Sequence, residues 1–451
     1  MKQQSDLRPV ATSRILRTEL RRSGARWAAL TLLVTSTWLL YSGRERWPVG
    51  YMLLALDQRW YLPLLIGLAM AAGAAQAGRE RRARVGELFA GVPRPRAQQV
   101  VPMLLAYGIP LFLAYVGATA LAALRIVSTA HYLRTGAFAG VVTAGALAVV
   151  AAAWFGLLIG RVLPYVATAP GLAIAALVSP LAAQWLAGRA QWLSSLVFPF
   201  TGLGGLTDFA SLPGRFSIAQ ILYLSGLAAG AALLFAATRR RDRLRALIPP
   251  ALGTAAAVLL LHGGSAFVSD PVDPAARELV CTGDGPPVCV ARLHSGVLTE
   301  VTPPARAALA RLARLPDGPS RAQEYLDAAD RPVHQSPDTL LIPLTIDENG
   351  HASDLDRLEG YLLRNLGVLP FACPDDSPGP DTATVAAAEA WLLGTDPEPA
   401  GRNSAAEAAE ARELLRGLRR LDEPAAAARV AAVRRAVLAC TTGDLRNRPP
   451  A

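Results

Sequence analysis

Apolar segments of membrane-spanning length fill residues 27–267, and residues 269–451 are far more polar. A helix that crosses a bilayer needs about 20 mostly apolar residues. An odd number of such segments places the two flanking parts of the chain on opposite sides of the membrane. The sequence therefore predicts a polytopic helix bundle at 27–268 and a soluble domain at 269–451. The predicted spans are 27–43, 60–78, 101–124, 137–160, 167–187, 218–237 and 247–267.

Charge divides the chain at the same place. Residues 1–268 carry 26 Lys and Arg against 8 Asp and Glu, a net charge of +18, and residues 269–451 carry 19 against 27, a net charge of −8. A basic chain can indicate nucleic-acid binding. Here the positive charge lies beside apolar segments, where it favours contact with anionic lipid. We therefore expect a lipid bilayer as a partner, and no nucleic acid.

Arginine-rich loops indicate the orientation. Arginines gather before the first span, after the second and after the sixth, whereas each loop predicted on the other face has two or three. Because basic loops lie on the cytoplasmic side, we expect a plasma-membrane protein with a cytoplasmic N-terminus and an extracytoplasmic C-terminal domain. Residues 1–26 have an apolar face that includes Ile15 and Leu20, with arginine elsewhere. They are expected to form an amphipathic helix on the inner membrane surface, and a solvated basic tail is the alternative.

The distribution of lysine excludes one class of motif. A P-loop needs Gly-Lys-Ser/Thr to reach nucleotide phosphates, and the only lysine is Lys2. The sequence also lacks His-Glu-x-x-His and Gly-x-Ser-x-Gly. We therefore expect a chain that is not an enzyme and holds no cofactor, with any ATP bound by a partner subunit.

The loop between the second and third spans, residues 79–96, has a distinctive pattern. It opens with charges, continues with a short amphipathic stretch and ends at prolines that cannot continue a helix. The pattern resembles the membrane subunits of ABC-2 type exporters, which have an amphipathic N-terminal helix, six spans and a cytoplasmic coupling helix between spans two and three. The residues that carry the resemblance are Arg79, Glu80, Gly86, Glu87, Leu88, Phe89, Pro93 and Arg94.

The resemblance covers about residues 11–240 and implies a function. It implies that 79–96 docks on a separate ATPase subunit, with Glu80 and Glu87 as charged contacts, and that two permease subunits form a homodimer or heterodimer. The seventh span and the soluble domain are additions to the family pattern, and Val85-Gly86 replaces a common Gly-Thr. The alternative for the loop is a basic segment that only sets topology. The alternative for the protein is a membrane receptor or scaffold that displays a sensing domain without transport.

All four cysteines lie in the predicted extracytoplasmic domain. Cys281 and Cys289 flank a turn-rich stretch, which predicts a hairpin closed by a local disulfide. Cys373 and Cys440 would then pair, although four cysteines allow three connectivities. An even number of cysteines on this side agrees with an oxidising compartment.

The C-terminal domain is predicted to be mostly helical with a small β element. A strand is expected within 338–346, ahead of a turn at Asn349-Gly350. The spacing of His294, His334 and His351 matches no common zinc site, and the Asn349-Gly350 region lacks the ligand pattern of a calcium loop. No metal is therefore expected. Helices are expected at 303–315, 319–329, 353–367, 382–394, 403–420 and 423–440.

Overall fold

The computed structural model describes residues 24–82, 96–200, 207–237, 239–261, 272–326, 335–369, 381–397 and 405–441. These residues are mainly helical and divide into two compact units. Unit 1 comprises Met1–Ser128 and Leu133–Asp273, and unit 2 comprises Thr129–Tyr132 and Pro274–Ala451. The predicted amphipathic helix at the N-terminus lies almost wholly outside the described residues.

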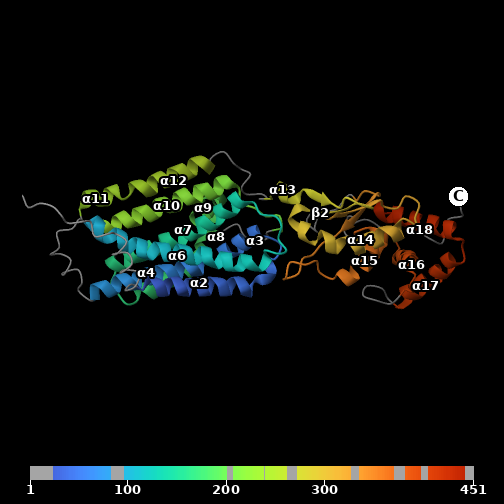
Figure 1. Ribbon diagram of the computed structural model, residues 1–451, viewed down its shortest axis with the longest axis horizontal. Helices are drawn as coiled ribbons and strands as arrows, with labels where there is room; N and C mark the ends of the chain where they lie inside the picture. The colour runs from blue at the N-terminus through green and yellow to red at the C-terminus, as the bar shows by residue number, and fades with distance from the viewer. Residues whose placement is uncertain are drawn as a thin grey trace, which may run out of the picture. The chain divides into compact units, whose positions relative to one another are not determined.

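Unit 1 is a helix bundle (Figure 1). Five of the described segments are long and apolar enough to cross a membrane, namely α6, α7, α8, α10 and α11–α12. Helices α3 and α4 meet this requirement only together, and they are bent by 55° at the break between them. The elements are α2 (Ala25–Ser42), η1 (Arg44–Arg46), α3 (Tyr51–Trp60), α4 (Leu62–Arg82), α6 (Arg96–Ile126), α7 (Thr135–Val162), α8 (Thr168–Ala187), α9 (Gln191–Val197), α10 (Gly214–Ala236), α11 (Arg240–Arg245) and α12 (Ile248–Leu261).

The seven predicted spans are confirmed only in part. Helix α2 corresponds to the first, but Arg26 and several hydroxyl side chains make it less apolar than the five. Residues 44–59, predicted as an outer loop, instead contain η1 and α3. The sixth and seventh predicted spans correspond to α10 and α12, and residues 262–267 lie outside the described part.

Helix α7 lies at the centre of the bundle. Its most apolar stretch is 67% buried, against 11% for α8 and for α11–α12. Small residues allow helices in a membrane to approach closely. Gly156 of α7 is an example, because a Cβ there would lie 2.2 Å from the Met70 carbonyl oxygen of α4. Helices α10 and α12 make a similar approach at Gly226 and Gly253.

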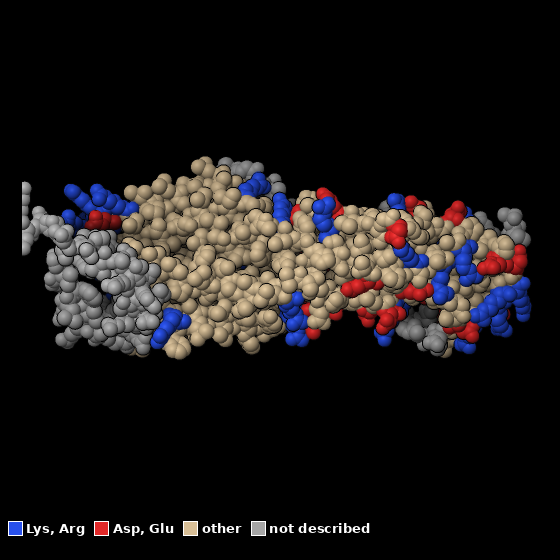
Figure 2. Space-filling model, in the orientation of Figure 1, with Lys and Arg blue, Asp and Glu red and all other residues tan. Residues whose placement is uncertain are grey.

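The surface of unit 1 agrees with a membrane protein. On the face that Figure 2 shows, charged side chains lie near the two ends of this unit and a broad uncharged surface lies between them. Large exposed apolar side chains contribute to such a surface, among them Leu113, Ile174, Leu181 and Leu259.

The segment that precedes unit 2 is held at one end of the bundle. The N–H of Asp273 donates to the Phe209 carbonyl (2.9 Å), and its carboxylate pairs with Arg134 (3.2 Å). Phe209 and Arg134 lie just before α10 and α7. The chain therefore leaves unit 1 at the end where these two helices begin, and the arginines of α11 follow the opposite end of α10.

Unit 2 contains a four-stranded sheet in the order β1-β2-β3-β4. Strand β1 (Leu279–Cys281) pairs antiparallel with β2 (Val288–Ala291), whereas β3 (Arg321–Glu324) is parallel to β2 and to β4 (Thr339–Ile342). Side chains from the sheet pack with α14, α15, α16 and α18 in one apolar core. The other elements are α13 (Pro274–Arg277), η3 (Arg292–Val297), α14 (Leu298–Leu312), α15 (Leu355–Leu363), η4 (Arg364–Gly367), α16 (Thr382–Leu393), α17 (Ala405–Arg419) and α18 (Glu423–Leu438).

The mostly helical domain with a small β element is confirmed for the described residues. The predicted helix at 319–329 is wrong, because Arg321–Glu324 forms β3 between two neighbouring strands. The predicted hairpin between Cys281 and Cys289 and the strand within 338–346 are present. The predicted turn at Asn349-Gly350 is present too, with Gly350 at a φ of +85°.

Candidate functional site

The loop predicted to contact an ATPase lies mostly outside the described residues. Helix α4 continues to Arg82, so the backbone at Arg79 and Glu80 is helical. The remaining loop residues on which the prediction rests lie outside the described part, namely Gly86, Glu87, Leu88, Phe89, Pro93 and Arg94. Their role in coupling stays a prediction.

A polar triplet at the end of α3 lies inside the bundle. It consists of Asp57, Gln58 and Arg59, and the side chains of Gln58 and Arg59 are 0% and 1% exposed. The Asp57 carboxylate pairs with the Arg46 Nε at 3.0 Å. Ionisable groups inside a membrane bundle are costly and generally mark a functional path, so this triplet is the natural starting point for a candidate site.

Gln58 connects α3 to two neighbouring helices. Its Nε2 donates to the Ser36 hydroxyl of α2 (3.1 Å) and to the Tyr115 carbonyl of α6 (3.0 Å). The Thr119 hydroxyl, also on α6, donates to the Gln58 Oε1. These contacts satisfy the amide, because each polar atom of this buried side chain has a partner.

Arg59 connects the same helix to α7 and α10. Its Nε and Nη2 donate to the Val141 carbonyl of α7 (3.2 and 2.8 Å), and its Nη1 donates to the Gln220 Oε1 of α10 (2.8 Å). The Gln220 Nε2 in turn donates to the Ser195 carbonyl of α9 (2.9 Å). Arg59 has no carboxylate within 4.0 Å in the described part of the chain. Its charge is therefore held by neutral oxygens alone.

Three buried hydroxyl groups lie on α6, α9 and α10, and none has a hydrogen-bond partner among the described residues. Ser217 lies one turn before Gln220, and its Cβ is 2.9 Å from the place of a Cβ on Gly140. The Tyr115 hydroxyl packs against Gly145, one turn beyond Val141. The third hydroxyl is that of Ser195. We call Arg59, Gln220, Tyr115, Ser195 and Ser217 the Arg59 cluster.

The cluster has hydrogen-bonding groups that remain unused. A guanidinium has five N–H groups, and three of those of Arg59 make hydrogen bonds. Two N–H groups of Arg59 therefore make no hydrogen bond in the described part of the chain, and the three hydroxyls, which can donate or accept, have no partner there. A positive charge with unused N–H groups has the chemistry of a site for an anion or for a strongly polar oxygen group.

Sequence reasoning missed the Arg59 cluster. A hydropathy window separates residues 44–59 from the second span, because three polar residues in a row lower the mean hydropathy at Asp57–Arg59. A usable signal was present, since this triplet interrupts a run that is apolar from Tyr51 to Ala75. A buried polar triplet indicates a bent or re-entrant helix when apolar residues flank it on both sides.

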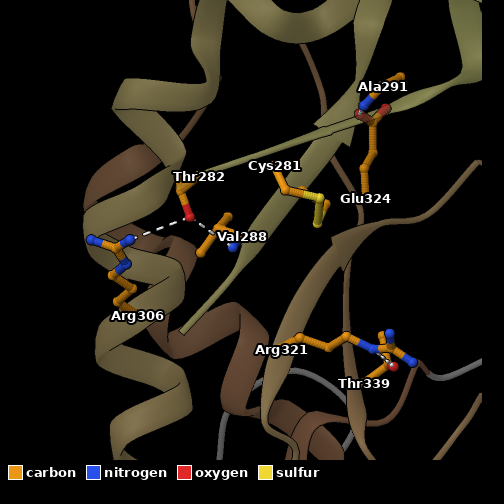
Figure 3. Close-up of a disulfide and its surroundings, with 9 residues drawn as sticks. Cys281, Thr282, Val288, Ala291, Arg306, Arg321, Glu324 and Thr339 are labelled. Atoms are coloured by element: carbon orange, nitrogen blue, oxygen red, sulfur yellow. Dashed lines mark hydrogen bonds between the residues drawn. A yellow bond between two sulfur atoms is a disulfide. The ribbon is translucent and has the colours of Figure 1, made fainter. Parts of the chain in front are cut away.

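The disulfide of unit 2 joins two paired strands (Figure 3). Cys281 of β1 and Cys289 of β2 are register partners and are covalently linked. This is the pairing that the turn-rich sequence favours. Cys440 is also disulfide-bonded, and Cys373 lies outside the described residues.

Two histidines of unit 2, His294 and His351, each contact a different carboxylate. The Nδ1 of His294 lies 2.5 Å from the Oε1 of Glu324, and both side chains are buried. Figure 3 shows the Glu324 carboxylate beside Ala291, whose N–H donates to its Oε2 at 2.6 Å. His351 instead contacts Glu300 at 2.7 Å, and this hydrogen bond raises the pKa of the imidazole.

The described residues contain no group of three or more His, Cys, Asp or Glu side chains placed to hold a metal ion. His334 lies outside the described part. The Asp347 carboxylate accepts hydrogen bonds from the N–H groups of Asn349 and His351. This acidic side chain thus stabilises a turn, and those hydrogen bonds help to lower its pKa against the effect of burial.

Comparison of the chain with protein-family models, with curated proteins and with solved structures gave no significant match. A functional interpretation therefore depends on the residues and the geometry of this chain.

Proposed function

We propose that this chain is the membrane-spanning permease subunit of an ABC-type exporter. The observation that carries the proposal is the pattern of residues 79–96, between α4 and α6, which resembles the coupling segment of ABC-2 permeases. The loop would bind a separate ATPase subunit, and two permease subunits would form the transport path. ATP binding and hydrolysis would belong to the partner, because no lysine follows Lys2 in this chain.

The bundle supports transport over simple anchoring. An anchor needs no charged group inside the membrane, whereas Arg59 lies buried at the break between α3 and α4. Broken helices that expose polar groups at membrane depth are a recurring way to build a site for cargo. The Arg59 cluster is the part of unit 1 that has this character.

The proposed orientation puts the ATPase-binding loop in the cytoplasm. Basic residues follow α10 and surround the ends of α4 and α6, and basic loops favour the cytoplasmic side. Asp273, which precedes unit 2, lies at the end where α7 and α10 begin. Unit 2 would then be extracytoplasmic, where disulfides persist.

The proposal is tested by affinity purification of the full chain in mild detergent, followed by mass spectrometry. The expected partner is a stoichiometric protein with a Walker A motif. A Glu87→Arg variant should lose this partner because the contact charge is reversed, and its thermal stability should match the wild type. Glu45→Arg is the matched control for charge reversal, because Glu45 is an exposed glutamate in η1 and lies outside the loop at 79–96. A folded wild-type chain that retains no ATPase would contradict the proposal.

A membrane receptor or scaffold is the second candidate. It is favoured by the size and compactness of unit 2, which has its own sheet and apolar core. In that case unit 2 would bind a ligand outside the cell. Unit 1 would either transmit the binding signal across the membrane or only anchor unit 2 to it. Co-purification of a kinase or a regulatory protein in place of an ATPase would favour this candidate.

A further inference from the structure

We infer that the Arg59 cluster binds an anionic group, such as a phosphate or a carboxylate, carried by an amphipathic molecule. The inference that such a molecule is the cargo rests on the proposed transport function. The inference that the cluster binds it does not. The anionic group would balance the positive charge of Arg59 inside the bundle.

The buried guanidinium has no negative partner among the described residues. Moving a charge out of water costs several kcal/mol unless an opposite charge or strong hydrogen bonds compensate. Arg59 is 1% exposed and contacts only the Val141 carbonyl and the Gln220 amide. The nearest acid along the helix, Asp57, is paired with Arg46. An incoming anion would complete the compensation.

The neutral groups of the cluster can also donate to an anion. The hydroxyls of Ser195, Ser217 and Tyr115 are buried without partners among the described residues. A hydroxyl can donate to an anion at little cost, and hydrogen bonds to a charged group are about twice as strong as neutral ones. An ammonium ligand would instead repel the guanidinium. The cluster thus discriminates by charge.

The depth of the cluster favours an amphipathic carrier over a wholly polar one. Val141 and Gln220 each lie six residues inside the start of their helix. At 1.5 Å per residue this is about 9 Å below the helix ends. The outer faces of α8 and α12 next to the membrane are apolar, with Leu181 and Leu259 strongly exposed. A molecule with an anionic head and an acyl tail matches both environments.

The test is direct binding to the full chain purified in a neutral detergent, without any ATPase. The probe is radiolabelled lysophosphatidic acid, and the competitors are monoacylglycerol with the same acyl chain and inorganic phosphate. Lysophosphatidic acid should bind at least about tenfold more tightly than monoacylglycerol, because only the former brings a charge to Arg59. Displacement by inorganic phosphate would identify the headgroup chemistry as sufficient. Failure of phosphate to compete would show that the tail is needed as well.

Variants locate the binding. Arg59→Gln should weaken lysophosphatidic acid binding by about tenfold or more, and Arg59→Lys should restore part of it. Ser217→Ala should weaken lysophosphatidic acid binding by about fivefold. This variant leaves the charge of Arg59 unchanged. Arg161→Gln is the matched control, because Arg161 lies at the far end of α7 and donates to the Phe235 carbonyl.

Equal binding of lysophosphatidic acid and monoacylglycerol by the wild type would overturn the inference, even if Arg59→Gln fails to fold. Unchanged binding by folded Arg59→Gln and Ser217→Ala would overturn it too. Neither result bears on whether an ATPase co-purifies, so failure of this inference and failure of the proposed function are separate outcomes.

Discussion

Two buried arginines, one in each unit, are held by neutral oxygens. Arg59 contacts a carbonyl and an amide in unit 1, and Arg434 of α18 in unit 2 is 3% exposed and donates to three carbonyls. Burial lowers the pKa of Arg434 from its usual value, yet an arginine keeps its charge in proteins. The two sites differ in their surroundings. Buried hydroxyls without partners among the described residues lie on α6, α9 and α10 of the bundle that holds Arg59, whereas Arg434 joins segments of its own unit.

Replacement of Arg434 should destabilise unit 2. Its Nε donates to the Leu366 carbonyl and its Nη2 to the Pro337 carbonyl, at 3.2 and 2.9 Å. Arg434→Met keeps the bulk but leaves these acceptors buried, so the free energy of unfolding should fall by about 3 kcal/mol. Protease susceptibility of unit 2 in the full chain, measured across a denaturant series, reports this change. Arg435→Met, at an exposed position on the same helix, is the control, and equal effects of the two variants would contradict the role assigned to Arg434.

Single residues were only partly predictable from the sequence. The cysteine spacing indicated the Cys281–Cys289 hairpin, because the turn between them is local. Arg59 could not be placed from sequence, because its partners Val141 and Gln220 are 82 and 161 residues away. The same holds for Glu324, whose contact with His294 joins β3 to η3.

At the scale of elements, long apolar helices were predicted well and short segments poorly. Helices α6, α7, α8 and α10 follow the predicted spans within a few residues, because their apolar composition alone defines them. Residues 321–324 read Arg-Ala-Gln-Glu, all strong helix formers. They form a strand because β2 and β4 offer hydrogen bonds on both sides. Tertiary pairing thus outweighs intrinsic propensity in a segment of four residues.

Close packing of α4 and α7 should depend on the missing side chain at Gly156. A Cβ at this position would lie 2.2 Å from the Met70 carbonyl oxygen, so Gly156→Ala must push the two helices apart. Overpacking of this kind costs about 1–3 kcal/mol, and the thermal stability of the chain in detergent should fall. Gly136→Ala on the same helix meets nothing within 4 Å. This control should be neutral or stabilising, and a similar loss in both variants would contradict the packing argument.

At the scale of the whole molecule, hydropathy and charge predict a membrane part followed by a soluble part, with a boundary at 268–269. The chain divides into its two compact units nearby, between Asp273 and Pro274, and the solubility of unit 2 stays a prediction. The number of helices that cross the membrane could not be predicted from hydropathy, because α2 is only weakly apolar and the pair α3–α4 is bent. A window average cannot distinguish a bent pair of helices from a loop followed by a span.

Sidedness gives a prediction for the intact cell. With the proposed orientation, a cysteine introduced at Arg243 in α11 should react with a membrane-impermeant maleimide only after permeabilisation. A cysteine at Glu413, an exposed position of α17, should react in intact cells. The described cysteines are all disulfide-bonded, so they contribute little background. The reverse labelling pattern would show that the orientation is opposite to the one proposed. The loop at 79–96 would then not be cytoplasmic.

The hydrogen bonds of Arg434 can form only late in synthesis. Its three acceptors precede it by 68, 97 and 117 residues. The segments around Asp317, Pro337 and Leu366 therefore emerge from the ribosome well before the side chain that joins them. Until α18 has followed, these three carbonyls lack the hydrogen bonds that Arg434 donates. Helix α18 therefore completes this set of hydrogen bonds only after the other segments of the set have been synthesised.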